Sequence, residues 1–253
     1  MVKRRNCLTE QAAVVLLCLC ALFAVSPLIL VAAASLRGGL SVFADFYLWK
    51  PSLLHAMTNS ILISFAASAG TIAVSVFAAY VFAKVKFRGR DFLFYLYIIV
   101  MMMPFQVTLL PQYIVSRDWG IYDTTAALIL PGIFSAFGTF ILTQILKTMP
   151  DDMIEAAKLE TGSTLRLLWY VVLPNLRGGI VCLFILQFTE LWNMVAEPLV
   201  LMETELKMPL AAMLNGDAPV VLAATVVFLF LPFLLYLLFS DTLREEMGSM
   251  VVK

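Results

Sequence analysis

The chain has 253 residues and a formal net charge of zero, and 62% of its residues are hydrophobic whereas only 13% are charged. A soluble domain carries about 25% charged residues. The composition therefore excludes an ordinary soluble protein and predicts one that resides in the lipid membrane. Because there is no basic excess, it also argues against nucleic acid as a partner.

Six apolar stretches are long enough to cross a membrane as helices. In chain order they cover residues 12–36, 59–83, 92–110, 124–146, 178–201 and 218–239. Helices are expected because an open strand would leave its backbone polar groups unsatisfied in lipid. The predicted fold class is an all-α membrane protein with six transmembrane helices, forming a single transmembrane domain over residues 1–253.

The first stretch follows Lys3, Arg4 and Arg5, as the core of a secretory signal peptide would. Its apolar run is longer than the roughly 7–15 residues of such a core, which favours a transmembrane helix. The sequence VAAAS near its end resembles a cleavage site, so a signal peptide remains the alternative.

The distribution of basic residues predicts the orientation. With the N-terminus inside, all but four of the 17 Lys and Arg residues fall on the cytoplasmic side. The positive-inside rule favours this arrangement, which places both termini in the cytoplasm. The longest inner segment, residues 147–177, then connects spans four and five, and no other inner loop is long enough for a folded element. The four outer basic residues are Arg37, Lys50, Arg117 and Lys207.

The loop sequence MPDDMIEAAKLETG predicts a short cytoplasmic helix with marked ends. Pro150 precedes it, Asp151 and Asp152 can cap its N-terminus and complement its dipole, and Gly162 can end it. The i, i+3, i+4, i+7 spacing places four residues on one face, where two alanines would admit a closely packed partner. These four are Met153, Ala156, Ala157 and Glu160.

A second helix, LRLLWYVVLP, is expected after a cap at Ser163 or Thr164 and is broken by Pro174. Its Trp169 and Tyr170 suit the membrane interface. The alternative for the loop as a whole is a helical segment that lies on the lipid headgroups, anchored by Arg166 and Arg177.

The sequence contains no G-x-x-x-x-G-K-[ST] motif, so an ATP site of the P-loop kind is not predicted. It contains no H-E-x-x-H motif and no Cys/His cluster, so a metal site is not predicted either. No catalytic residues are assigned. Three polar residues are candidates for a translocation path, because polar groups inside a membrane are costly and tend to be functional. They are Glu190, Asn193 and Gln106, the last beside a kink expected at Pro104. The alternatives for Glu190 are a contact with a second permease subunit and a position at a bend near the outer surface.

Residues 155–174, EAAKLETGSTLRLLWYVVLP, resemble the EAA loop of permease subunits of binding-protein-dependent ABC importers. In that family Glu-Ala-Ala and three residues precede a glycine, and a hydrophobic run then ends in Leu-Pro. Glu155–Ala157 and Leu173–Pro174 match at the family's spacing, whereas Thr161 occupies the usual glycine position and Gly162 follows it. Segments around spans two to five, including ELWNMVAEPLVL, resemble the carbohydrate-type, maltose-permease-like members.

The resemblance implies a coupling helix over residues 151–161 that docks into an ATP-hydrolysing subunit. It further implies a prokaryotic inner-membrane location, no cofactor in this chain and no catalysis by it, with ATP and Mg on the partner ATPase. The implied partners are a second permease subunit, the ATP-binding subunits and an external solute-binding protein. The implied coupling residues are Met153, Glu155, Ala156, Ala157, Leu159, Glu160 and Gly162.

By the same resemblance, the solute is a sugar, an oligosaccharide or a related polyol, and the outer loop at 202–216 faces the external binding protein. An ordinary connection is the alternative for that loop. A stand-alone secondary transporter or channel is the alternative function. Such a carrier usually has several intramembrane ionisable groups and internal repeats, and it has no need of a docking helix.

Overall fold

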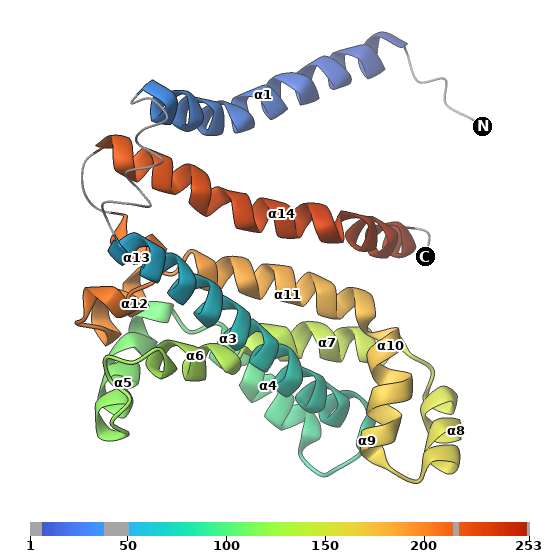
Figure 1. The fold of residues 1–253 in the computed structure, drawn as a ribbon. Helices are drawn as coiled ribbons and strands as arrows, with labels where there is room; N and C mark the ends of the chain where they lie inside the picture. The colour runs from blue at the N-terminus through green and yellow to red at the C-terminus, as the bar shows by residue number, and fades with distance from the viewer. Residues whose placement is uncertain (1–6, 38–50, 215–217, 252–253) are drawn as a thin grey trace. The chain divides into compact units, whose positions relative to one another are not determined.

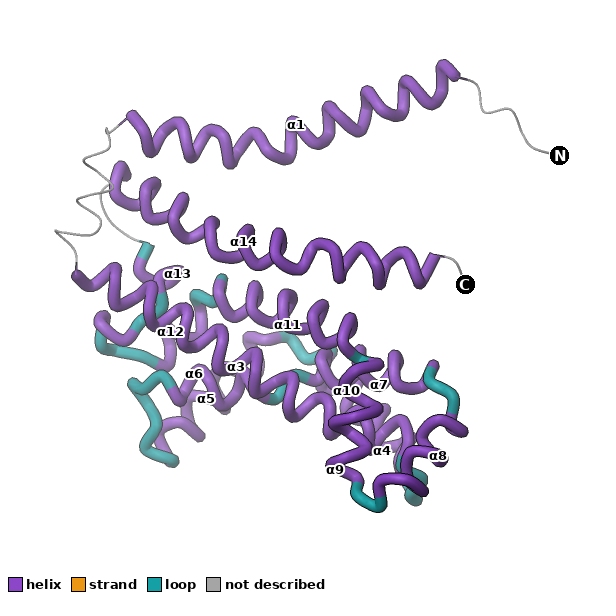
Figure 2. Tube along the Cα trace, turned by 45° about the vertical axis from the view of Figure 1, so that its right-hand side comes forward, coloured by secondary structure: helices purple, strands orange, loops and turns teal. Residues whose placement is uncertain are grey.

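The computed structural model describes residues 7–37, 51–214 and 218–251. Within these ranges all regular structure is helical, as Figures 1 and 2 show, which confirms the predicted all-α class. The chain divides into two compact units. The first holds Met1–Pro51 and Leu214–Leu229, and the second holds Ser52–Met213 and Phe230–Lys253. The assignment of one domain to residues 1–253 stays a prediction.

The first unit contains α1 (Cys7–Arg37) and the beginning of α14 (Ala218–Val251). Helix α1 is apolar on all sides. Its candidate span is Val14–Leu36, and no residue is buried within the most hydropathic window of that span. A helix that is hydrophobic all round is stable only where lipid or other protein surrounds it. This helix therefore has the character of a membrane segment.

The second unit begins with α3 (Pro51–Lys84), the long helix seen beside α11 and α7 in Figure 1. Helix α7 packs against both α4 and α11, and α12 packs against α5 and α6. The remaining part of α14 also belongs to this unit. The other elements, in chain order, are α4 (Arg90–Met101), α5 (Phe105–Asp118), α6 (Ala126–Ile133), α7 (Ala136–Thr148), α8 (Asp151–Thr161), α9 (Thr164–Leu167), the π-helical turn η1 (Leu168–Val172), α10 (Leu173–Asn175), α11 (Arg177–Trp192), α12 (Ala196–Leu201), the 3₁₀ turn η2 (Glu205–Lys207) and α13 (Leu210–Met213).

Four segments are long and apolar enough to cross a membrane, and two bent helix pairs raise the number of candidate spans to six. The four are Val14–Leu36, Leu53–Lys84, Ala126–Thr148 and Val221–Thr242. The bent pairs are Arg90–Met101 with Phe105–Asp118, and Thr164–Asn175 with Arg177–Trp192. A multi-pass helical protein is thus confirmed, with six as the upper count.

Three of the predicted spans are interrupted in the structure, among them the span over 124–146, which is divided into α6 and α7. The span expected over 92–110 is interrupted before Pro104, and the helices on either side differ in direction by 97°. The break agrees with the kink expected there, because proline cannot donate a backbone hydrogen bond. The span expected over 178–201 ends at Trp192, and α12 begins only at Ala196.

Close packing of α3 against α6 and α7 depends on small residues. Thr71 of α3 donates a hydrogen bond of 2.7 Å from Oγ1 to the carbonyl of Gly132. A Cβ atom at Gly138 would lie 2.8 Å from Oγ of Ser75, so only glycine fits there. In lipid the hydrophobic effect does not drive helices together, so their association depends on the close packing that small side chains allow. The small polar residues buried along α3 are Ser60, Ser64, Ser68, Thr71 and Ser75.

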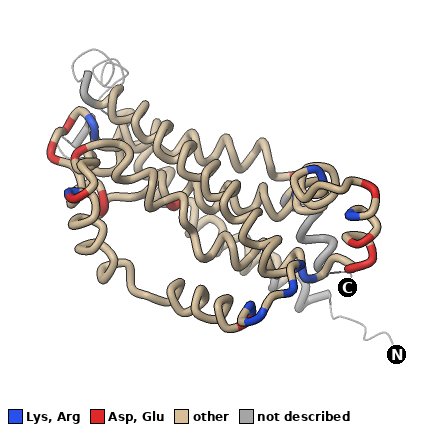
Figure 3. The backbone as a smooth tube through the Cα atoms, turned by 90° about the horizontal axis from the view of Figure 1, so that it is seen from below, with Lys and Arg blue, Asp and Glu red and all other residues tan. Residues whose placement is uncertain are grey.

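Charged residues of the second unit gather at the two ends of its helices (Figure 3). Five basic residues line one cavity where α3, α4, α7 and α8 meet. Lys207, which is predicted to lie on the opposite side of the membrane, does not line this cavity. Its Nζ lies 2.8 Å from the carboxylate of Asp123. The orientation of these two ends in a membrane stays a prediction.

Candidate functional site

The loop helix α8 has the predicted bounds, Asp151–Thr161. Pro150 precedes it in an extended conformation, and Gly162 ends it with φ at +58°, a left-handed conformation that glycine adopts without a steric penalty. Pro150 occupies the N-cap position and makes no side-chain capping hydrogen bond, and the two aspartates expected as caps, Asp151 and Asp152, lie in the first turn instead. Their negative charge there complements the helix N-terminus.

The faces of α8 differ from the prediction. Ile154 and Ala157 are only 2% and 7% exposed, and both belong to a hydrophobic cluster of the second unit that includes Leu146 of α7 and Leu167 of α9. Ala156 and Glu160 are exposed, so Ala157 does not share an exposed face with them. Its methyl group packs against the chain's own core.

The outward face of α8 carries an uncovered apolar side chain. Leu159 is 89% exposed, and Glu155, Ala156 and Glu160 beside it are exposed as well. Met153 is partly exposed at the edge of this face. We call Glu155, Ala156, Leu159 and Glu160 the outer face of α8.

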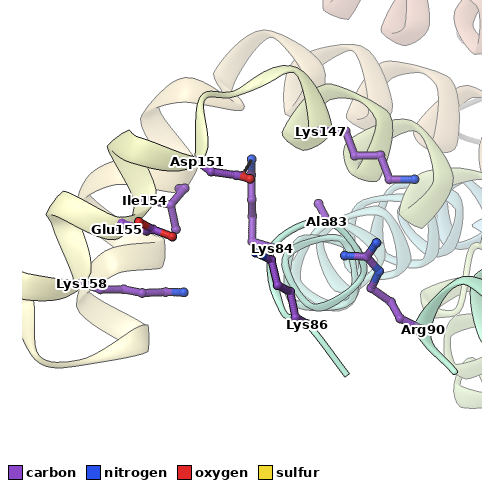
Figure 4. Close-up of a pocket in the computed structure, with 9 residues that line it drawn as sticks. All are labelled: Ala83, Lys84, Lys86, Arg90, Lys147, Asp151, Ile154, Glu155 and Lys158. Atoms are coloured by element: carbon purple, nitrogen blue, oxygen red, sulfur yellow. Dashed lines mark hydrogen bonds and ion pairs between the residues drawn. The ribbon is translucent and has the colours of Figure 1, made fainter. Parts of the chain in front are cut away.

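A nearly buried lysine joins α8 to the end of α3. Nζ of Lys84 lies 2.7 Å from Oδ1 of Asp151 and donates a hydrogen bond of 2.6 Å to the carbonyl oxygen of Met149 (Figure 4). The Lys84 side chain is 3% exposed, whereas that of Asp151 is 70% exposed. The hydrogen bond from Lys84, and then its charge, lower the pKa of the Asp151 carboxyl. The start of α8 is thus fixed to α3.

The rest of the loop returns to the bundle through α9, η1 and α10. Leu167, Leu168 and Val172 are buried, whereas Trp169 and Tyr170 are exposed, as an interfacial position of the two aromatic residues requires. Ser163 makes no side-chain capping bond to α9. The chain turns by 79° between Asn175 and Arg177, close to the break expected at Pro174.

A cavity of about 330 Å³ lies among α5, α6, α7, α11 and α12. Glu190 of α11 lines it, whereas Asn193 and Gln106 do not. The role of these three residues in a translocation path stays a prediction. The side-chain amide of Asn193 donates instead to the carbonyl of Thr189 at 2.7 Å. Five further polar residues line the cavity, of which Gln187 donates to Glu190 at 3.5 Å. These five are Thr108, Gln112, Ser135, Gln187 and Glu197.

Sequence reasoning missed these lining glutamines, although one signal was present. Gln187 precedes Glu190 by three residues, so the two lie on the same face of a helix. Gln112 follows Pro111 within α5 and lines the cavity, and α5 leaves α4 at an angle of 97°. No local pattern in the sequence gives the direction of that bend.

At the other end of the unit, Asp123 holds the segment after α12. Its carboxylate accepts hydrogen bonds from the backbone N–H groups of Glu203 and Thr204, both at 3.0 Å, and from Nζ of Lys207 at 2.8 Å. The bond from Lys207, followed by those from Thr204, strongly lowers the pKa of Asp123. The described part of the predicted outer loop at 202–216 is therefore tied to its base, while residues 215–217 lie outside the described residues.

Comparisons with known proteins agree with this architecture. The family described as "Binding-protein-dependent transport system inner membrane component" matches residues 71–244. The sn-glycerol-3-phosphate transport system permease protein UgpE of Yersinia pestis is 31% identical over 145 residues, which are 57% of this chain and 52% of that protein. The protein of the same name from Brucella abortus is 33% identical over 148 residues, which are 58% and 52% of the two chains.

The chain thus spans about half the length of the curated relatives it matches. One solved structure is similar over almost the whole chain. It is a crystal structure of a bacterial ABC transporter involved in the import of the acidic polysaccharide alginate. The TM-score is 0.84 at 19% sequence identity, with 95% of this chain and 98% of the other covered. This likeness shows that the two chains share a fold.

Proposed function

Because the chain belongs to the family of binding-protein-dependent transport system inner membrane components, we propose that it is the membrane-spanning subunit of an ATP-driven importer. In this proposal the six candidate spans all cross the inner membrane and both termini lie in the cytoplasm. The subunit is not catalytic. ATP and Mg bind to separate ATPase subunits, and this chain carries no cofactor of its own.

The observation that carries the proposal is the placement of α8. The helix is fixed to α3 by Lys84 and packed through Ile154, yet it exposes Leu159 almost completely. Burying a leucine side chain contributes about 1.5–3 kcal/mol, so a partner gains affinity by covering it. We therefore assign the outer face of α8 to the ATPase subunit, with Met153 and Gly162 at its margins.

The contact between Lys84 and Asp151 supports a mechanical role for this helix. A helix that serves as a coupling element has to transmit displacement to the membrane spans without pivoting on its loop. The salt bridge to α3 and the packing of Ile154 and Ala157 against the core connect α8 to the spans at two places. Movement of the ATPase is then passed to α3 and to the bundle.

The solute path forms between this chain and a second permease subunit, and the cavity at Glu190 is the contribution of this chain. Its lining contains two carboxylates, Glu190 and Glu197, and no lysine, arginine or histidine. Two like charges about 4 Å apart repel by roughly 1 kcal/mol in water and about 4 kcal/mol at an effective dielectric constant near 20. The lining therefore favours a solute without negative charge, such as a neutral sugar or polyol, whose hydroxyl groups donate to the carboxylates.

The solute is delivered by an external binding protein that contacts the segment held by Asp123. Four donors of this segment bind the Asp123 carboxylate: the backbone N–H groups of Glu203 and Thr204, Oγ1 of Thr204 and Nζ of Lys207. The segment therefore presents a defined surface. The named relatives transport sn-glycerol 3-phosphate, an anion, and the acidic cavity of this chain argues for a different solute here.

The experiment that tests the proposal is affinity purification of this chain from its native membrane in mild detergent, followed by mass spectrometry of the proteins that accompany it. We expect an ATPase and a second permease in stoichiometric amounts. Recovery of the chain alone, with solute transport in liposomes that contain no ATP, would instead support a stand-alone secondary transporter or channel. The family membership and the exposed docking helix disfavour that alternative.

A further inference from the structure

A cavity of about 340 Å³ opens where the ends of α3 and α7 meet the beginnings of α4 and α8. Its lining is unusually basic, with five basic and two acidic residues (Figure 4). The carboxylates are those of Asp151 and Glu155, and because Glu155 also belongs to the outer face of α8, the cavity borders that face. The basic residues are Lys84, Lys86, Arg90, Lys147 and Lys158.

Only part of this positive charge is compensated within the chain. Lys84 pairs with Asp151, and Nε of Arg90 lies 3.0 Å from Oδ1 of Asp91. Lys86 and Lys158 form no ion pair within the described residues, and Figure 4 shows Lys158 extending from α8 toward the end of α3. The cavity therefore has an excess of positive charge that an anion would neutralise.

A second hollow, of about 350 Å³, adjoins the first and shares Lys86 and Arg90 with it. Two aromatic residues with exposed rings, Phe87 and Phe92, line this hollow, together with Gly89 and with Asp91, whose carboxylate is paired with Arg90. Phe92 lies at the start of α4, a helix of the bundle whose outward side chains are apolar. A basic cavity thus continues into an apolar surface at the point where the bundle meets the loops.

We propose that this pair of hollows binds an anionic phospholipid, with the phosphate in the basic cavity and the glycerol and first acyl carbons against Phe87 and Phe92. Basic pockets between transmembrane helices on the cytoplasmic side are typical sites for anionic headgroups. The site rests on the orientation proposed above, which places this end of the bundle in the cytoplasmic leaflet. A soluble phosphate would use the basic cavity alone, whereas a phospholipid uses both hollows.

The position of the site gives it a consequence for coupling. Its lining includes Lys84, which holds the start of α8, and Lys158, which projects from α8 itself. A bound phosphate draws Lys158 toward Lys86 and adds a third connection between α8 and the end of α3. The lipid composition of the cytoplasmic leaflet then affects how firmly the docking helix is held.

The test uses the full chain purified in a neutral detergent and three probes: short-chain phosphatidylglycerol, short-chain phosphatidylcholine and inorganic phosphate. Binding is measured by native mass spectrometry and calorimetry. We expect phosphatidylglycerol to bind more tightly than the other two. In the double variant K86Q/K158Q the affinity should fall about tenfold or more, since each basic residue near an anionic surface contributes about 1 kcal/mol.

The control variant is Arg88→Gln, because Arg88 is exposed in the same loop but lines neither hollow. Its affinity for phosphatidylglycerol should stay within about twofold, and K86R/K158R should retain binding. Equal binding by the wild type and K86Q/K158Q would overturn the site. Inorganic phosphate binding as tightly as phosphatidylglycerol would overturn the lipid as its ligand. Neither result depends on transport, so both are distinguishable from a failure of the importer proposal.

Discussion

Lys84 and Asp151 are 67 positions apart in the sequence, yet Nζ of the first lies 2.7 Å from the carboxylate of the second. This ion pair joins the last residue of α3 to the first residue of α8. Because the lysine is nearly buried and the aspartate is exposed, a substitution of Lys84 and a substitution of Asp151 differ in their effects. Removal of the lysine leaves the carbonyl of Met149 without its donor, whereas removal of the aspartate leaves a buried ammonium without its counter-charge.

The first prediction concerns the Lys84–Asp151 contact. In Lys84→Gln, α8 should be held less firmly, so that ATP hydrolysis by the assembled importer continues while uptake falls severalfold. Arg88→Gln is the control, because Arg88 is exposed in the loop after α3 and lines neither of the two hollows described above. Uptake per ATP hydrolysed, measured in proteoliposomes, checks the prediction. An unchanged ratio in Lys84→Gln would contradict the mechanical role of the contact.

The second prediction concerns pH. The folded-state pKa of Asp151 is lowered, so the contact stabilises the fold fully above the unfolded value of about 3.9 and is lost only as the pH falls through the lowered value. We therefore expect the distance between spin labels at positions 88 and 160 to be the same from about pH 5 to 8. Lys84→Gln should broaden the distance distribution throughout this range. A change confined to the acidic end would contradict the assignment.

The third prediction tests the outer face of α8. Leu159→Asp should abolish co-purification of the ATPase while the chain remains in the membrane, because it places a charge where an apolar contact is proposed. Leu206→Asp is the matched control, since Leu206 is also exposed but lies in η2 at the opposite end. Quantitative mass spectrometry of the purified complex gives the readout. Equal loss in both variants would indicate a general folding defect.

Ala157 shows why the sequence predicted the existence of the loop helix but not its faces. Proline before the helix, glycine after it and the spacing of the motif are local signals, and the observed bounds agree with them. Which alanine is turned inward depends on Leu146 and Leu167, which come from other elements. A large residue at position 157 should therefore act by displacing α8 from its own core, not by blocking the ATPase directly.

The bends of the bundle were likewise only partly predictable. A proline at position 104 indicates a break, because the backbone loses a hydrogen bond there, but it does not give the 97° change of direction that follows. Gln112 lines the cavity and Gln106 does not, and the sequence does not show which of the two lies there. Glu190 was a candidate from the cost of placing a carboxylate within a membrane span.

The fourth prediction concerns the packing of α3 and α7. Gly138→Ala should lower stability by about 1–3 kcal/mol, because the new methyl group would overlap Oγ of Ser75 in a close-packed interface. Adding Ser75→Ala should restore part of this loss, since the two sites are in contact. Thermal unfolding of the purified chain in detergent measures both variants. Purely additive effects would show that the two helices do not meet at this point.

The claim on which the account depends is that the outer face of α8 docks onto an ATPase. The most direct measurement is disulfide or bifunctional cross-linking from Leu159→Cys, in a background without the native cysteines, in membranes that contain the assembled importer. We predict that Leu159→Cys gives a cross-linked product with the ATPase subunit and that the yield of this product changes when ATP is added. The control is Tyr170→Cys, because Tyr170 is exposed on η1 and not on α8. We predict no cross-linked product from it. Cross-linking from position 170 but not from position 159 would contradict the assignment of α8 as the docking helix.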